Sequence, residues 1–445
     1  MVRHLLATLA FLASSTAAAD AYRTFEVTPG VTWSRTVHPW ISVEEMQFTV
    51  EGRQPPTSGT MRAPADVVLA IQGWKATPEQ LAWANANGVA LELDCTKPMP
   101  RARHVVCSMA VDFAVLAANP DLETLSINGE VRNVPALRKL KKLRTFDVGT
   151  NITDAMVKEL ATLTQLQRLA LERREVTDAH LAQLTKLTEL RSLSLTGSTI
   201  TDAGLVHLRA FPKLTSLRLG ATISTGGPNA IATPVLTSAG LEVVGSLSQL
   251  RALDLSGSNS GAGIPHLATL TQLEAFRGPN NVDEDGFAVV AKLTKLRALA
   301  HYGTSGVTDD SIGHVQKLPL ELLDVKYTAV GDKGAAAIGA LARLELLGVP
   351  REIGDAGMKQ LARLSKLRQI DLSDTRVTDD GMKLLPRMKA LETVNIANND
   401  ARITLASIAS LAKLPNLREL IAGGTRFGYK GCPALEATLG RKVCM

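Results

Sequence analysis

The stretch "LRSLSLTGSTITDAGLVHLRAFPK", residues 190–213, contains the pattern that decides the fold. Leu193 and Leu195 lie two residues apart at the end of its first run, which is the period of a strand that buries one face. After a polar break, Leu205, Leu208 and Phe211 recur three residues apart, which predicts a helix with one apolar stripe. The stretch therefore predicts a strand, a turn, a helix and a return to the next strand.

The same pattern recurs along most of the chain. Runs of the form L-x-x-L-x-L, with conservative replacements, begin at residues 122, 143, 166, 190, 214, 250, 273, 296, 320, 344, 367, 391 and 417. Nearly all neighbouring starts lie 23 or 24 residues apart. One such unit cannot bury its apolar side alone, so we expect neighbouring units to stack, with the strands in one parallel sheet and the helices outside.

This period and pattern resemble the leucine-rich repeat family, over residues 110 to 430. The resemblance implies an α/β fold, a right-handed horseshoe solenoid with a parallel sheet on its concave face and helices on its convex face. We expect about thirteen repeats over 111–430, a strand-rich segment with a disulfide cap at 20–110 and a disulfide cap at 431–445. The T-D-x-G-L form of the corner resembles the cysteine-containing repeats of F-box proteins, with Thr or Ser in place of the cysteine. No F-box-like segment stands before them, so we carry over the repeat geometry alone.

The polar break "TDAG" at 201–204 has the composition of a catalytic site, but related breaks follow most of the other runs. Repetition favours a structural corner. Thr201 stands where a hydroxyl caps a helix, Asp202 lies in the first turn, where negative charge suits the helix dipole, and Gly204 leaves room between coils. We expect the same two roles in other repeats. The helix caps are Thr153, Thr177, Thr308 and Thr378, and the first-turn aspartates are Asp154, Asp178, Asp309, Asp332, Asp355 and Asp379.

The first 19 residues predict export. Arg3 is followed by an apolar run from Leu5 to Ala13 and then by small residues, which is typical of a signal peptide cut after Ala19 or Ala21. The alternative, a membrane anchor, needs an apolar run of about 20 residues. We therefore expect a periplasmic or secreted protein that is not inserted in a membrane after cleavage.

Four cysteines suit an oxidising compartment. The spacing between Cys95 and Cys107 equals that between Cys432 and Cys444, and we predict these two local disulfides. A zinc site is the alternative, although the spacing matches no metal-binding pattern.

The N-terminal segment differs in kind from the repeats, because the four tryptophans, Trp33, Trp40, Trp74 and Trp83, all lie there. Residues 77–88 predict a helix, and the strand-like segments 89–95 and 104–111 could pair as a hairpin closed by the first disulfide. Two interpretations remain open: a cap over the first repeat, or a module that recognises carbohydrate or cell wall through its aromatic residues. Residues 222–233 form a twelve-residue insertion after a strand. They are either a functional loop or a surface loop whose extra length is tolerated at little cost in stability.

No sequence motif indicates an enzyme. The eight histidines are scattered outside HExxH and similar patterns, and His180, His207 and His301 fall on repeat positions that favour structural roles. We expect no catalytic residues, no metal and no cofactor. The formal net charge of +6 comes without a basic run, so nucleic acid is not indicated.

The outward residues of the strands line the concave face, which in this family is commonly the binding surface. We therefore predict a monomeric scaffold that binds a protein partner, with these contact residues: Arg218, Asp254, Arg277, Tyr302, Asp324, Lys326 and Tyr327. Because the charges alternate in sign, mutual salt bridges across neighbouring strands are the alternative use of the same residues.

Overall fold

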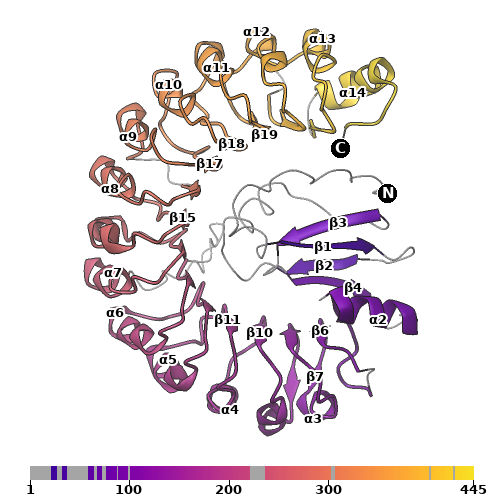
Figure 1. Ribbon diagram of the computed structural model, residues 1–445, viewed down its shortest axis with the longest axis vertical. Coiled ribbons are helices and arrows are strands. Elements are labelled where there is room, and N and C mark those ends of the chain that lie inside the picture. The colour runs from indigo at the N-terminus through magenta and orange to yellow at the C-terminus, as the bar shows by residue number, and fades with distance from the viewer. Residues whose placement is uncertain are drawn as a thin grey trace. The chain divides into compact units, whose positions relative to one another are not determined.

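The computed structural model describes residues 22–27, 33–37, 59–64, 68–72, 77–87, 89–98, 101–220, 236–301, 306–399, 402–423 and 426–444 (Figure 1). The chain forms two compact units, Met1–Asp254 (unit 1) and Leu255–Met445 (unit 2). No helix within the described ranges is long and apolar enough to cross a membrane. The predicted signal peptide, the insertion 222–233, and Trp40 and Trp74 lie outside the described residues, as do the side chain of Trp33 and all of Tyr302.

Unit 1 is built on a sheet that is parallel except at its first strand pair, where β2 and β4 are antiparallel. Its strands, in sheet order, are β2 (Trp33–Val37), β4 (Val68–Gln72), β5 (Ala90–Glu92), β6 (His104–Cys107), β8 (Thr124–Ile127), β10 (Thr145–Val148), β11 (Arg168–Leu171), β12 (Ser192–Ser194), β13 (Ser216–Arg218) and β14 (Ala252–Asp254). Two short ribbons accompany it, β1 (Tyr22–Val27) with β3 (Gly59–Pro64), antiparallel, and β7 (Val111–Asp112) with β9 (Val131–Arg132), parallel.

The helices of unit 1 alternate with these strands and lie on one side of the sheet (Figure 1). They are α2 (Pro78–Asn87), α3 (Phe113–Leu116), η1 (Val134–Lys139), α4 (Asp154–Leu160), α5 (Asp178–Gln183), η2 (Leu184–Lys186), α6 (Asp202–Leu205), η3 (Val206–Ala210) and α7 (Ser238–Gly245), where η denotes a 3₁₀ helix. α2 confirms the helix expected at 77–88.

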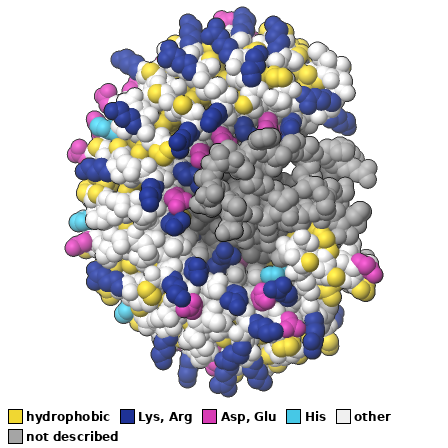
Figure 2. Space-filling model, in the orientation of Figure 1, with side chains coloured by type: hydrophobic (Ala, Val, Ile, Leu, Met, Phe, Trp, Pro, Cys, Tyr) yellow, Lys and Arg dark blue, Asp and Glu magenta, His cyan; other side chains and the backbone are white. Residues whose placement is uncertain are grey.

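Unit 2 repeats the arrangement with parallel strands throughout. The strands are β15 (Ala275–Arg277), β16 (Ala298–Ala300), β17 (Leu322–Asp324), β18 (Leu346–Gly348), β19 (Gln369–Asp371), β20 (Thr393–Asn395) and β21 (Glu419–Ile421). The helices are η4 (Gly261–Thr269), α8 (Glu284–Val290), α9 (Asp309–His314), α10 (Ala335–Ile338), α11 (Asp355–Leu361), α12 (Asp379–Met382), η5 (Leu385–Arg387), η6 (Leu405–Ser407), α13 (Ile408–Leu411) and α14 (Arg426–Leu439). In the view of Figure 2, Lys and Arg side chains are frequent along the lower margin, over unit 1, and along the upper margin, over unit 2, with Asp and Glu between them.

The repeated apolar residues form the core between sheet and helices. Leu193 and Leu195 on and after β12, and Leu205, Leu208 and Phe211 from the following helices, are each at most 1 % exposed. Burying one such side chain stabilises the fold by roughly 1.5–3 kcal/mol. The leucine pattern therefore holds neighbouring coils together, as the sequence predicts.

The corner residues join each coil to the next. Thr201 accepts a hydrogen bond from the Ala203 backbone N–H and so caps α6, as predicted. The carboxylate of Asp178, in the previous coil, accepts hydrogen bonds from the Thr201 backbone N–H (2.8 Å) and hydroxyl (2.6 Å). A Cβ added at Gly204 would lie 2.0 Å from Asp178 Oδ1, so only glycine fits beside this carboxylate. We call this contact of an aspartate with the helix start of the next coil an aspartate clasp.

The aspartate clasp recurs in both units. Its members pair Asp202 with Thr237, Asp309 with Gly331 and Gly334, Asp332 with Gly354 and Gly357, Asp355 with Thr378 and Gly381, and Asp379 with Thr404 and Ser407. In α5 a histidine takes the place of the glycine. His180 Nδ1 accepts from the Thr177 N–H and Nε2 donates to Asp154 (2.7 Å). The clasp thus adds a contact between coils to the dipole role that the sequence predicts.

His301, directly after β16, occupies a position that holds a leucine or valine in most repeats. His301 is 1 % exposed, and its ring packs against Phe287 in a T-shaped arrangement with 6.0 Å between the ring centroids. Neither ring nitrogen has a hydrogen-bond partner among the described residues. Burial in these surroundings lowers the pKa of His301 from the ordinary 6.5 to about 4. The imidazole is therefore neutral in the folded protein near pH 7.

Both predicted disulfides are present, Cys95–Cys107 and Cys432–Cys444. The hairpin expected around the first disulfide is wrong, because β5 and β6 pair in parallel. β5 and β6 are therefore successive parallel strands of the unit 1 sheet, arranged like the strands of the repeats. At the other end, Cys444 pairs with Leu420 of β21 and covers the sheet edge there.

Candidate functional site

One row of outward-facing side chains crosses the sheet of unit 2 at the last residue of strands β15 to β20. Strand register aligns Arg277, Ala300, Asp324, Gly348, Asp371 and Asn395. Side chains alternate along a strand, and the preceding residues, such as Leu323 and Leu347, are buried in the core. The row therefore lies on the sheet face opposite the helices.

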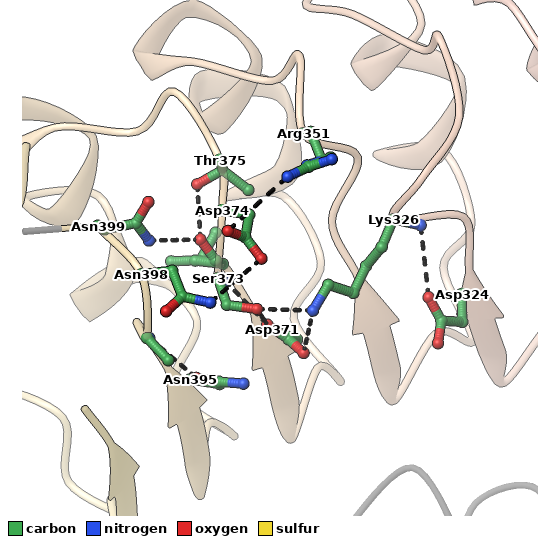
Figure 3. Close-up of polar contacts among 12 residues, drawn as sticks. Asp324, Lys326, Arg351, Asp371, Ser373, Asp374, Thr375, Asn395, Asn398 and Asn399 are labelled. Carbon is green, nitrogen blue, oxygen red and sulfur yellow. Dashed lines mark hydrogen bonds and ion pairs between the residues drawn. The ribbon is translucent and has the colours of Figure 1, made fainter. Parts of the chain in front are cut away.

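Lys326 is the central charge of this surface, and its side chain reaches across one strand (Figure 3). Its Nζ lies 2.8 Å from Asp371 Oδ2 and donates a hydrogen bond to Ser373 Oγ at 2.6 Å. Gly348, on β18 between these strands, has no side chain to block the path. Burial alone would lower the pKa of Lys326, but Asp371 outweighs it and the pKa is raised. Lys326 therefore keeps its positive charge. Asp371 balances that charge and, with Ser373, holds the side chain in one position.

Tyr327 is the exposed aromatic residue beside this ion pair, at 36 % exposure. Two cations lie near its ring, Lys326 Nζ at 5.7 Å and Arg351 Cζ at 5.5 Å from the centroid. Arg351 also approaches Asp374, with 3.9 Å between Nη2 and Oδ1, and its side chain is 50 % exposed. Tyr327 and Arg351 are the accessible part of the surface.

In unit 1 the corresponding face carries a network of ion pairs around Arg218. Its guanidinium lies 3.6 Å from Glu172 Oε1 and 3.3 Å from Asp254 Oδ2, and Ser194 Oγ donates to Glu172 Oε1 at 2.6 Å. Asp254 is 1 % exposed. These charges neutralise one another across neighbouring strands.

The repeats also match a known family. Residues 186–208, 317–339 and 363–385 match the sequence model of the family described as "Leucine Rich repeat". The chain carries leucine-rich repeats. No curated protein matches the chain. Among solved structures, an internalin (inlF) from Listeria monocytogenes is similar at 18 % identity, with a TM-score of 0.44, 63 % of this chain covered and 82 % of that one. TLR13 in a complex with ssRNA13 is similar at 13 % identity, with a TM-score of 0.40, 74 % and 59 % covered.

Of the contact residues predicted on the leucine-rich repeats, the structure brings Asp324, Lys326 and Tyr327 together in unit 2, and Arg218 with Asp254 in unit 1. Arg277 is half-buried at the first strand of the unit 2 row. For Arg218, Asp254 and Lys326 the geometry is that of the alternative interpretation, mutual salt bridging. The binding role of all seven predicted residues stays a prediction.

Sequence reasoning missed Gly348 and Arg351. A glycine at the end of β18, where the repeats on either side carry aspartate, interrupts the charged row and is visible in "LELLGV" at 344–349. Arg351 follows the strand by three residues, in the turn between coils, where the repeat pattern fixes no residue type. Its position beside Tyr327 follows from the stacking of coils rather than from the repeat pattern.

Gly348→Ala is expected to block the Lys326 side chain where it crosses β18. The resulting overpacking is expected to lower the free energy of unfolding by about 1–2 kcal/mol. The added Cβ would lie 2.3 Å from Asp324 Oδ1 and 3.1 Å from Lys326 Cγ. Chemical denaturation measures the loss. Gly423→Ala is the matched control, because no described atom lies within 4 Å of a Cβ there. Equal stability of the two variants would contradict the crossing geometry.

Proposed function

We propose that this protein is an exported, non-enzymatic scaffold that binds a protein partner through the outward sheet face of unit 2, around Tyr327 and Arg351. Leucine-rich repeats of this kind support a protein-binding role in general. The observation that carries the specific surface is the exposed Tyr327 ring beside two cations. Tyr and Arg are the residue types enriched at interface hot spots.

The neighbouring ion pair supports the same surface. Lys326 is fixed by Asp371 and Ser373, so the edge of the Tyr327 site is already ordered before a partner arrives. An ordered surface loses less side-chain entropy on binding. Arg351 is half-exposed and only loosely paired, and it can exchange Asp374 for a carboxylate of the partner. Export is supported by the two disulfides, which form in oxidising compartments.

The test is affinity capture from envelope and secreted extracts with the full chain. A partner retained by the wild type is expected to bind the Tyr327→Ala/Arg351→Ala variant with a loss of about 2–4 kcal/mol, measured by calorimetry. Tyr429→Ala is the matched control, because this tyrosine of α14 is 81 % exposed in the same unit but lies on a helix. Retention of every partner at unchanged affinity by the double variant would overturn the proposed surface. Capture of no protein would overturn the scaffold role.

A further inference from the structure

The sheet edge where the strands begin carries a second row of side chains, one residue before each strand. Backbone hydrogen bonds link these residues from coil to coil, so they lie side by side. In unit 2 the row reads Glu274, Arg297, Glu321, Glu345, Arg368, Glu392 and Arg418; in unit 1, from β10 onward, it reads Arg144, Gln167, Arg191, Thr215 and Arg251. We call this the entry row.

In unit 2 the entry row neutralises itself. Arg297 lies 2.8 Å from Glu321 and 3.9 Å from Glu274, and Arg368 lies 3.0 Å from Glu392. These two arginine side chains are only 31 % and 18 % exposed. An arginine bound on both sides by carboxylates offers little to a partner.

In unit 1, Glu123, the entry-row residue before β8, pairs with Arg103 at 2.7 Å. From β10 onward the acidic positions between the arginines are replaced by neutral Gln167 and Thr215. Arg144 and Arg191 are exposed, and neither forms an ion pair with any residue that the structure describes. Glu189 lies near Arg191, but its first partner is Lys213, at 2.7 Å, which lowers the pKa of Glu189 more than Arg191 does. Strands are about 4.8 Å apart, so alternate entry-row arginines recur at about 10 Å.

Further cations lie beside Arg144. Lys139 and Lys141, from the end of η1 and the turn to β10, are exposed and have no ion-pair partner within the described ranges. No acidic residue occurs between 133 and 146. The repeat period thus places Arg191, which is distant in the sequence, on the same edge of unit 1 as Arg144.

We propose that the unit 1 entry row, with Lys139 and Lys141, docks an acidic, extended segment of a partner protein. This proposal rests on the protein-binding role above and adds a second surface to it. Guanidinium groups bind carboxylates through two parallel hydrogen bonds, and regularly spaced arginines suit a chain with regularly spaced carboxylates. The exposed large apolar residues of the described chain include no aromatic residue on this edge, so it offers no platform for stacking nucleic-acid bases.

The test uses labelled poly-L-glutamate as the probe and fluorescence anisotropy of the full chain at low and at physiological ionic strength. Arg144→Gln/Arg191→Gln is expected to weaken binding on the order of 10-fold, and Lys139→Gln/Lys141→Gln to a similar degree. The matched control is Arg297→Gln/Arg368→Gln, which removes the same number of charges from the same row in unit 2 and is expected to change affinity less than about twofold.

Three outcomes would overturn the proposal: no saturable binding of poly-L-glutamate at low ionic strength, an equal loss in the two arginine variants, or tighter binding of single-stranded DNA or anionic phosphatidylglycerol vesicles at equal charge. Circular dichroism checks that each variant is folded. The Tyr327→Ala/Arg351→Ala variant is expected to bind the probe normally, which separates failure of this edge from failure of the surface proposed above.

Discussion

Asp379→Ala is expected to lower the free energy of unfolding by about 2–3 kcal/mol, whereas Asp380→Ala, one residue further along the same helix, is expected to change it by less than about 0.5 kcal/mol. Both aspartates lie in the first turn of α12. Asp379 forms an aspartate clasp and accepts hydrogen bonds from the Thr404 backbone N–H (2.9 Å) and hydroxyl (2.6 Å) and from the Ser407 hydroxyl. Asp380 is exposed and pairs only with Lys383 among the described residues.

The pair of variants separates two physical roles. If interaction with the helix dipole were the main effect, the two neighbouring carboxylates would contribute about equally. The clasp predicts a large difference, because removing Asp379 leaves donors of the next coil, including the buried Ser407 hydroxyl, without their acceptor. Urea denaturation at neutral pH measures both values, and equal losses would contradict the clasp.

The same contact has a pH dependence. Burial raises the pKa of Asp379, but the hydrogen bonds from Ser407 and Thr404 outweigh it, so the pKa is lower than the ordinary value of 3.8. The folded state therefore releases this proton more readily than the unfolded chain does. The stabilisation from Asp379 is present above its ordinary pKa and is lost as the pH falls through the lowered one.

His301→Leu is expected to reduce the acid sensitivity of unit 2. Between pH 6.5 and about 4 the unfolded chain binds a proton at His301 that the folded chain does not bind, so stability falls as the pH falls through this window. Lowering the pH from about 7.5 to about 4.5 is expected to cost the wild type about 2–3 kcal/mol more than it costs the variant, which has no titrating group at this position.

Denaturation curves at the two pH values measure this difference, and hydrogen exchange of the amides of β16 and α8 locates it. His314→Gln is the matched control, because His314 of α9 is 39 % exposed and lies 3.8 Å from Glu284. The change in hydrogen exchange at β16 is expected in His301→Leu and not in this control. Unchanged acid sensitivity in His301→Leu would show that the imidazole is accommodated in its charged form.

The repeating elements could be predicted from the sequence because each depends on neighbours in the chain. Leu193, Leu195 and the cap at Thr201 follow from local periodicity and local hydrogen bonding, and the structure has them as predicted. Ser258, Thr328 and Thr375, at the polar position after the strand, likewise form a local hydrogen bond, each to a backbone carbonyl three residues back. Both disulfides could also be predicted from the local sequence, since each closes a short loop.

Contacts between coils could not be predicted in the same way. The partner of Asp178 lies 23 residues away, and that of Lys326 lies 45 residues away, across an intervening strand. Such pairs require the register of the stacked strands, which the repeat pattern does not give residue by residue. The hairpin at Cys95 was wrongly expected for a related reason, because local strand propensity is the same for parallel and antiparallel pairing.

The aspartate clasps have one direction along the chain: the carboxylate always belongs to the earlier coil and the donors to the later one, from Asp178 to Asp379. In unit 2, the successive coils that carry Asp332, Asp355 and Asp379 each present an acceptor at one end and donors at the other. Removing or duplicating one whole coil between equivalent corners would leave matching ends at the junction. Coils joined in this way are interchangeable modules, and the number of coils can change without redesign of the contacts between them.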